Sequence, residues 1–434
     1  MSLVAARCDL LRIRLVSQPA TADDKSMVVG TGIRIAPAVR LRTGVVLQQK
    51  LMSLSSLYSR IGAPQLIALV LLLVFALQCV WFVGHEPLSA LESVYIEAGL
   101  LHREGYANAN TTQHTALVPL LAGVAARLSG AERRVDDFNR YRMAIRLPFL
   151  IVGMLLGASL WYVARRLYGN IGGYVALGLY CFSPLAIGCA SEVGPAVVGA
   201  WGGFGLIFTS IAVAHTLYAP REVVLWNWRR ILLLGLSIAI CVGAQFSFWI
   251  LLLPALLFML WVAHIRRGAA LVIFAAACVT GLIFLWPFYG FRPVAFARAL
   301  AHADWLEVAS RDFVSAGMSW LLSRYFLENG LGLLILTAVT LVAFVVWKRT
   351  RFFGTAAPLM VSLLLFSLGL RMHFSSFTFF LLALPFLILF MAGVSADLLE
   401  SRYAVVANAV VVGVLIANVM IDVYGLLNLN SRSH

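Results

Sequence analysis

The sequence predicts an all-α protein, a polytopic integral membrane bundle of about eleven transmembrane helices. Of its 434 residues, 62% are hydrophobic and only 12% are charged, and the mean hydropathy is +0.91. Soluble domains carry about 25% charged residues. Apolar runs of roughly 20 residues, the length that crosses a bilayer core, recur from Leu66 to the C-terminus. In lipid each backbone group must be bonded within its own segment, so these runs are expected to be helices.

The expected transmembrane helices are residues 66–83, 147–165, 171–189, 195–217, 231–246, 248–263, 269–288, 331–347, 355–370, 374–394 and 404–425. Their orientation follows from the connecting loops, because short cytoplasmic loops retain Lys and Arg. With a cytoplasmic N-terminus, the inner loops receive Arg165 and Arg166; Arg221, Arg229 and Arg230; Arg266 and Arg267; Lys348, Arg349 and Arg351; and Arg402. Two long segments, residues 84–146 and 289–330, then lie outside.

A single transmembrane domain is expected over residues 61–428. Residues 1–60 are basic and lack periodicity, so a disordered cytoplasmic tail is predicted there, and Met52 is an alternative start of translation. The net charge of +14 does not indicate nucleic-acid binding, because the basic residues lie at membrane boundaries, where they meet anionic lipid headgroups. The cysteines are scattered singly, so neither a disulfide framework nor a cysteine metal site is expected.

The first outer segment, residues 84–146, is expected to contain amphipathic helices at the membrane surface. Apolar residues recur at helical spacing at Leu91, Val94, Tyr95, Ala98 and Leu101, which predicts one face toward lipid or the bundle. The other face would hold Glu92 and Glu97. Ser89 stands three residues before Glu92, the spacing of a capping box, in which the Glu side chain accepts from the Ser amide.

Short motifs follow one another along the chain. They read Leu91-Glu92-Ser93-Val94-Tyr95, Gly105-Tyr106, His114-Thr115-Ala116-Leu117, Arg146-Leu147-Pro148, Ala164-Arg165-Arg166-Leu167-Tyr168-Gly169, Phe182-Ser183-Pro184-Leu185, and His373 with Ala383-Leu384-Pro385. In this order they resemble the GT-C glycosyltransferases that use lipid-linked sugars, in particular the bacterial relatives of the protein mannosyltransferases and of the lipid A aminoarabinose transferase. The resemblance covers most of residues 66–395.

The resemblance implies transfer of a sugar from a polyprenyl-phosphate donor to an acceptor glycan, lipid or protein, at the periplasmic face of a bacterial inner membrane. Glu92 is implied as the general base, which must lie within about 3 Å of the acceptor. The leaving phosphate needs a cation, either a side chain or a divalent metal ion. The side chains expected to bind the donor are His114, Tyr95, Arg146, Arg371 and His373.

The sequence departs from the family pattern at three places. Leu91 stands where the family has the first acid of an Asp-Glu pair, the two prolines that should follow His114 are missing, and Ala196 replaces an acid after Pro195. Glu192 lies four residues before Ala196 and is the candidate for a second acid.

Each assignment has a plainer interpretation. Glu92 is explained by the capping box, His114 by a polar helix start, and Glu192 by a solvated outer turn. The remaining basic residues, Arg146, Arg371 and His373, are explained by snorkelling to the interface. Two other functions therefore compete with the enzyme: a catalytically inactive, lipid-binding subunit of the same fold, and a membrane transporter. Spans almost free of ionisable residues argue against the transporter, because such residues mark ion paths.

Overall fold

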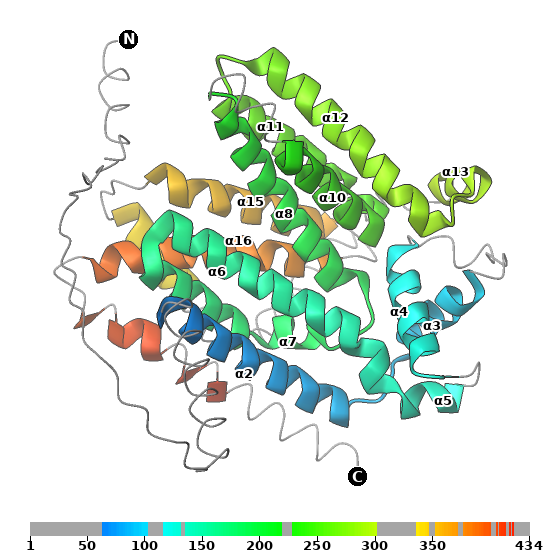
Figure 1. The fold of residues 1–434 in the computed structure, drawn as a ribbon. Coiled ribbons are helices and arrows are strands. Elements are labelled where there is room, and N and C mark those ends of the chain that lie inside the picture. The colour runs from blue at the N-terminus through cyan, green and yellow to red at the C-terminus, as the bar shows by residue number, and fades with distance from the viewer. Residues whose placement is uncertain are drawn as a thin grey trace, which may run out of the picture. The chain divides into compact units, whose positions relative to one another are not determined.

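The computed structural model describes residues 63–102, 116–131, 135–218, 228–301, 336–346, 352–371 and 376–400, with short pieces between 405 and 420. Every regular element in this part of the chain is a helix, as predicted (Figure 1). The helices are α2 Ala63–His85, α3 Ala90–His102, α4 Leu117–Leu128, α5 Val135–Arg140, α6 Arg142–Cys181, α7 Pro184–Ala190, α8 Pro195–Thr216, α10 Trp228–Ala244, the 3₁₀ helix η4 Phe246–Leu251, α11 Leu252–Val262, α12 Arg267–Leu285, the 3₁₀ helix η5 Trp286–Tyr289, α13 Pro293–Ala301, α15 Phe352–Arg371 and α16 Ser376–Leu399.

The protein is a multi-span membrane protein. Among the described residues, 5 helical segments are long and apolar enough to cross a membrane: Pro64–His85, Arg142–Cys181, Pro195–Thr216, Arg267–Tyr289 and Thr378–Leu399. Shorter apolar helices, including Leu336–Val346 and Ala356–Gly369, accompany them. The expected tail of residues 1–60 and parts of the expected spans 331–347 and 404–425 lie outside the described residues, so the total of about eleven stays a prediction.

Helix α6 corrects the expected spans 147–165 and 171–189. It runs over 40 residues and is interrupted at Gly169, whose φ of 82° and ψ of −175° are not helical. The segment after this break ends at Cys181, short of the expected residue 189, and α7 begins at Pro184. The reason is local, because a proline disfavours the helical conformation of the residue before it. Ser183 is extended (φ −91°, ψ 117°), and its hydroxyl caps α7 by accepting from the Ala186 amide.

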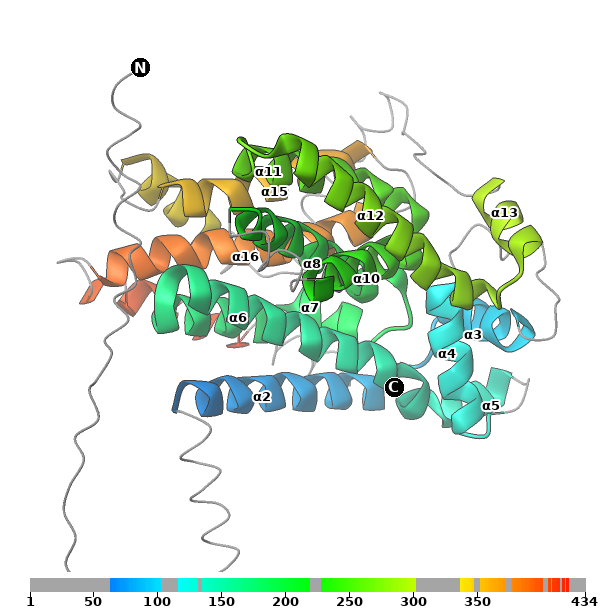
Figure 2. The same cartoon turned by 45° about the horizontal axis from the view of Figure 1, so that its top comes forward.

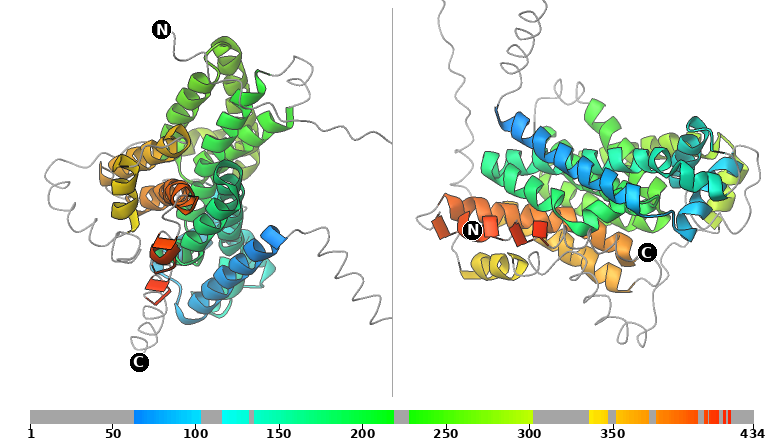
Figure 3. Two further views of the ribbon diagram at one scale, coloured as in Figure 1. Left: turned by 90° about the vertical axis from the view of Figure 1, so that its left-hand side faces the viewer. Right: turned by 90° about the horizontal axis from the view of Figure 1, so that it is seen from below.

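Helix α16 forms the centre of the bundle (Figures 2 and 3). It packs against α6, α8 and α15, and its residues 378–396 are all buried within the protein. On the other side of α8 lie α10 and α11, and α12 packs against α10. Small residues permit the close crossings, as is common between membrane helices. A Cβ on Gly202 of α8 would lie only 2.4 Å from the Cys241 nitrogen of α10.

Helices α3, α4 and α5, which belong to the segment expected on the outer side, lie at one end of the bundle beside the start of α6 (Figure 1). Helices α3 and α4 cross at two glycines with almost no space between their backbones. A Cβ on Gly99 would lie 1.9 Å from the Pro119 carbonyl oxygen, and one on Gly123 would lie 2.5 Å from the Gly99 backbone. This crossing fixes α3, the helix that carries Glu92, against the rest of the segment.

Candidate functional site

The predicted capping box at the start of α3 is confirmed. The Ser89 amide donates to Glu92 Oε2 at 2.7 Å, and the Glu92 amide donates to Ser89 Oγ at 3.2 Å. These two bonds satisfy amides that have no partner within the helix. They also fix the rotamer of Glu92, so the carboxylate stays at the helix end.

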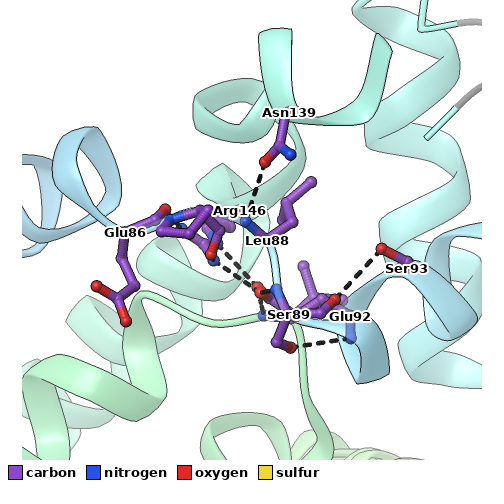
Figure 4. A network of polar contacts seen from close by, with 9 residues as sticks. Glu86, Leu88, Ser89, Glu92, Ser93, Asn139 and Arg146 are labelled. Atoms are coloured by element: carbon purple, nitrogen blue, oxygen red, sulfur yellow. Dashed lines mark hydrogen bonds and ion pairs between the residues drawn. The ribbon is translucent and has the colours of Figure 1, made fainter. Parts of the chain in front are cut away.

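Three further donors reach the same carboxylate from distant parts of the chain (Figure 4). Arg146 donates from Nε to Glu92 Oε1 at 2.8 Å and from Nη2 to Oε2 at 2.7 Å. The Val193 amide, in the turn before α8, donates to Oε1 at 2.9 Å. Glu92 is 2% exposed and Arg146 is 1% exposed. The cluster therefore joins the start of α3 to the starts of both α6 and α8.

Arg146 also holds the connection between α2 and α3. Its Nη1 donates to the Glu86 carbonyl at 2.8 Å and its Nη2 to the Pro87 carbonyl at 2.9 Å. Beside it, Asn139 Oδ1 accepts from the Leu88 amide at 3.0 Å, and Arg142 donates to the Gly84 carbonyl. The connection is thus bound by side chains from α5 and from the first turns of α6.

The bonding pattern limits what these two side chains can do chemically. A carboxylate offers about four lone-pair sites, and Glu92 accepts bonds from Ser89, from Val193 and twice from Arg146. A guanidinium has five N–H groups, and Arg146 uses four of them within the protein. In this conformation Glu92 has no free site for a proton, and Arg146 has a single N–H left for a ligand.

The predicted orientation of α3 was wrong for Glu92. We expected Glu92 and Glu97 on one polar face, but Glu92 is buried while Glu97 is exposed. Leu91 and Val94, expected on the face toward lipid or the bundle, are 56% and 41% exposed. Arg146 and the Val193 amide bind Glu92 inside the protein. These interactions stabilise the buried carboxylate, and the apolar pattern of α3 alone does not reveal them.

Tyr95 lies one turn after Glu92 on the same buried side of α3 and is 3% exposed. Burial raises the pKa of its hydroxyl to about 12, because the charged phenolate is disfavoured away from water. Tyr95 therefore stays protonated at neutral pH and can offer a hydrogen bond but no negative charge.

The other predicted site residues are only partly described. Glu192 is exposed in the turn before α8, one residue from the Val193 amide that binds Glu92. Arg371 is the last residue of α15, and its side chain is not described. His114 and His373 lie outside the described residues. Their convergence on this cluster stays a prediction.

Within the described part of the chain, no three His, Cys, Asp or Glu side chains are grouped so that they could hold a metal ion.

The pairing of Glu92 with Arg146 was not predicted, although one signal was present in the sequence. A charged residue at the start of an apolar run, as in Arg146-Leu147-Pro148, is rarely buried unless it is paired. The roles of Val193 and of the Glu86 and Pro87 carbonyls have no sequence signal, because backbone groups leave none.

The arrangement of helices is the GT-C fold of membrane glycosyltransferases. The structure is similar to that of ArnT from Cupriavidus metallidurans bound to undecaprenyl phosphate, with a TM-score of 0.56 and 12% identity, over 84% of this chain and 75% of that one. The apo state of the same protein gives a TM-score of 0.54 and 13% identity, over 83% and 75% of the two chains.

An archaeal relative of this fold is also similar. The oligosaccharyltransferase AglB from Archaeoglobus fulgidus, in complex with an inhibitory peptide and a dolichol-phosphate, matches with a TM-score of 0.53 and 10% identity, over 83% of this chain. The matched region spans 56% of AglB. No family model matches the sequence, and no curated protein matches it.

Proposed function

We propose that the protein transfers a sugar from a polyprenyl-phosphate donor to an acceptor at the outer face of a bacterial inner membrane. The observation that carries the proposal is the fold, which this chain shares over 84% of its length with a protein whose structure holds undecaprenyl phosphate. The cluster around Glu92 supports it, because it fixes an exposed acid, Glu192, beside a rigid turn at the expected outer end of the bundle.

The proposed reaction is a substitution at the anomeric carbon of the sugar. A new bond forms between this carbon and an acceptor oxygen or nitrogen, and the bond to the phosphate oxygen breaks. Polyprenyl phosphate leaves with the bonding electrons, and the acceptor proton passes to a general base. Positive side chains must meet the charge that develops on the phosphate; His114, Arg371 and His373 are the proposed contacts.

We assign the general base to Glu192 and a positioning role to Glu92. Glu92 accepts four hydrogen bonds and binds the amide of Val193, the residue that follows Glu192. Holding this amide fixes the backbone from which the Glu192 carboxylate extends. The other assignment, with Glu92 as the base, requires Glu92 to release one of its four bonds when the acceptor binds.

Two isosteric variants separate these assignments. Glu192→Gln should abolish most sugar transfer in membranes, by about 100-fold or more, and should lower the unfolding temperature less than Glu92→Gln does, because Glu192 is exposed and Glu92 is buried. Glu92→Gln should lower the unfolding temperature. Glu97→Gln, an exposed acid on the same helix, is the matched control and should change neither quantity.

Transfer assays with a radiolabelled polyprenyl-phosphate sugar and thermal unfolding in detergent provide the two readouts. Wild-type activity in Glu192→Gln, together with loss of activity but no loss of stability in Glu92→Gln, would return the role of base to Glu92. Absence of transfer by the wild type from any polyprenyl-phosphate sugar would refute the proposed function.

One observation favours a second candidate, a lipid-binding subunit without catalytic activity. Leu91 takes the place of the first acid in the family motif, and its side chain is 56% exposed at the start of α3. An apolar side chain cannot take a proton from an acceptor. For this candidate, undecaprenyl phosphate should stabilise the wild type while no sugar is transferred, and Glu192→Gln should bind the lipid as tightly as the wild type.

A further inference from the structure

Two buried side-chain oxygen atoms in one turn have no hydrogen-bond partner. They belong to Gln245, whose Oε1 is buried without a partner, and to Ser247, whose Oγ is equally unpartnered in a side chain that is 2% exposed. Buried polar atoms in proteins are nearly always bonded, because leaving water without a replacement bond costs free energy. Two such atoms in three residues therefore call for an explanation.

The backbone of this turn is well bonded, so the turn itself is not distorted. Gln245 is extended (φ −158°, ψ 132°) and ends the α10 helix, and its carbonyl accepts from the Phe248 amide at 3.1 Å. The 3₁₀ helix η4 follows directly. The missing hydrogen bonds are therefore those of two side-chain atoms, Gln245 Oε1 and Ser247 Oγ.

Contacts of neighbouring residues place the turn close to the cluster around Glu92. A Cβ on Gly199 of α8 would lie 2.1 Å from the Phe248 ring, so the turn packs against α8. Gly199 is one helical turn, about 6 Å, beyond Pro195, and Val193 just before α8 binds Glu92. Just before the turn, a Cβ on Gly243 would lie 3.4 Å from the side chain of Leu117, the first residue of α4. The turn thus lies near the first turns of α8 and the start of α4.

The chemistry of the two side chains indicates the kind of group that they would bind. An amide and a hydroxyl are both neutral, and each can donate and accept a hydrogen bond. A phosphate would favour a cation instead. Sugar hydroxyls also donate and accept, so they fit both side chains.

We infer that Gln245 and Ser247 bind hydroxyl groups of the sugar carried by the lipid donor. This inference rests on the proposed function, since it names the part of the donor that the turn recognises. Because Ser247 is 2% exposed, neighbouring side chains must move when the sugar enters. A site that binds hydroxyls discriminates against sugars that lack them, because its polar groups would stay unpaired.

The first test measures stability without ligand, in a detergent that has no sugar headgroup. Gln245→Leu and Ser247→Ala each remove an unpartnered polar atom, so both should unfold at the same temperature as the wild type or higher. Gln78→Leu is the matched control, because Gln78 in α2 also has a buried Oε1 without a partner. A lower unfolding temperature for both turn variants would show that their polar atoms have partners in the ligand-free protein, and would overturn the inference.

The second test measures binding by ligand-induced thermal stabilisation. The probes are undecaprenyl phosphate and the same lipid carrying glucose or aminoarabinose. The wild type should bind a sugar-bearing lipid more tightly than the bare phosphate, and this advantage should fall by roughly 2- to 10-fold in Gln245→Leu and Ser247→Ala. Gln78→Leu should keep the full advantage, and binding of undecaprenyl phosphate alone should be equal in all four proteins.

The outcomes separate this inference from the proposed function. An equal sugar advantage in the wild type and in both turn variants would refute the role of Gln245 and Ser247 alone. No sugar advantage in the wild type would also refute it. Failure of the proposed function would appear elsewhere, as wild-type protein that transfers no sugar in membranes.

Discussion

Replacing Glu92 by Gln tests whether the buried cluster fixes α3 to the starts of α6 and α8. Four donors meet the Glu92 carboxylate: the Ser89 and Val193 amides and two N–H groups of Arg146. A Gln side chain offers one acceptor oxygen, so its NH₂ group must face two of these donors. Arg146, which is 1% exposed, would also lose its counter-charge.

Breaking a buried ion pair by removing one charge typically costs about 3–5 kcal/mol. Glu92→Gln should therefore lower the unfolding temperature in detergent by roughly 5–10 °C. Arg146→Met should cost a similar amount, because it leaves a buried carboxylate without a cation. Glu97→Gln should change stability by less than about 0.5 kcal/mol, as exposed substitutions usually do.

A double-mutant cycle gives the decisive number. Glu92→Leu combined with Arg146→Met removes both charges. The loss of unfolding free energy in this double variant should be at least about 2 kcal/mol smaller than the summed losses of Glu92→Leu alone and Arg146→Met alone. Some loss should persist, because the Glu86 and Pro87 carbonyls and the Val193 amide lose their partners as well. Additive effects would refute the reasoning, since they would show that the two side chains do not depend on one another.

Two further predictions concern residues of α3, the first its packing, with a glycine of α7 as control, and the second its pH dependence. Gly99→Ala should destabilise the protein by more than 1 kcal/mol or so in thermal unfolding, because its Cβ would lie 1.9 Å from the Pro119 carbonyl oxygen. Gly188→Ala has nothing within 4 Å, so it should be neutral or stabilising. Tyr95 holds its proton more tightly in the folded state, where its pKa is raised from 10.0 to about 12. Its contribution is complete below pH 10 and is lost as the pH rises toward 12, so Tyr95→Phe should reduce the fall in unfolding temperature over that range; equal falls in both proteins would contradict this.

The class of the fold could be predicted because each membrane helix is encoded within its own stretch of sequence. The expected span 66–83 lies within α2, Ala63–His85, and its limits follow from apolar length alone. The capping box of Ser89 and Glu92 is equally local. Such features need no knowledge of what lies next to them in space.

The candidate site could be predicted only in part, because its contacts join residues that are far apart in the chain. Glu92 and Arg146 are separated by 54 positions, and Glu92 and Val193 by 101. The apolar pattern of α3 indicated a different buried face, since periodicity alone cannot weigh a charged partner on another helix. The unpartnered atoms of Gln245 and Ser247 likewise became visible only once their surroundings were known.

The contact between Glu92 and Val193 also has a consequence for biosynthesis. Ribosomes add about 5–20 residues per second, so the amide of Val193 is made roughly 5–20 s after the Glu92 carboxylate, from which it is 101 residues distant. During this interval the Glu92 carboxylate lacks at least one of the four hydrogen bonds that it accepts in the folded protein. The contact that joins α3 to the turn before α8 can therefore form only after this turn has been translated.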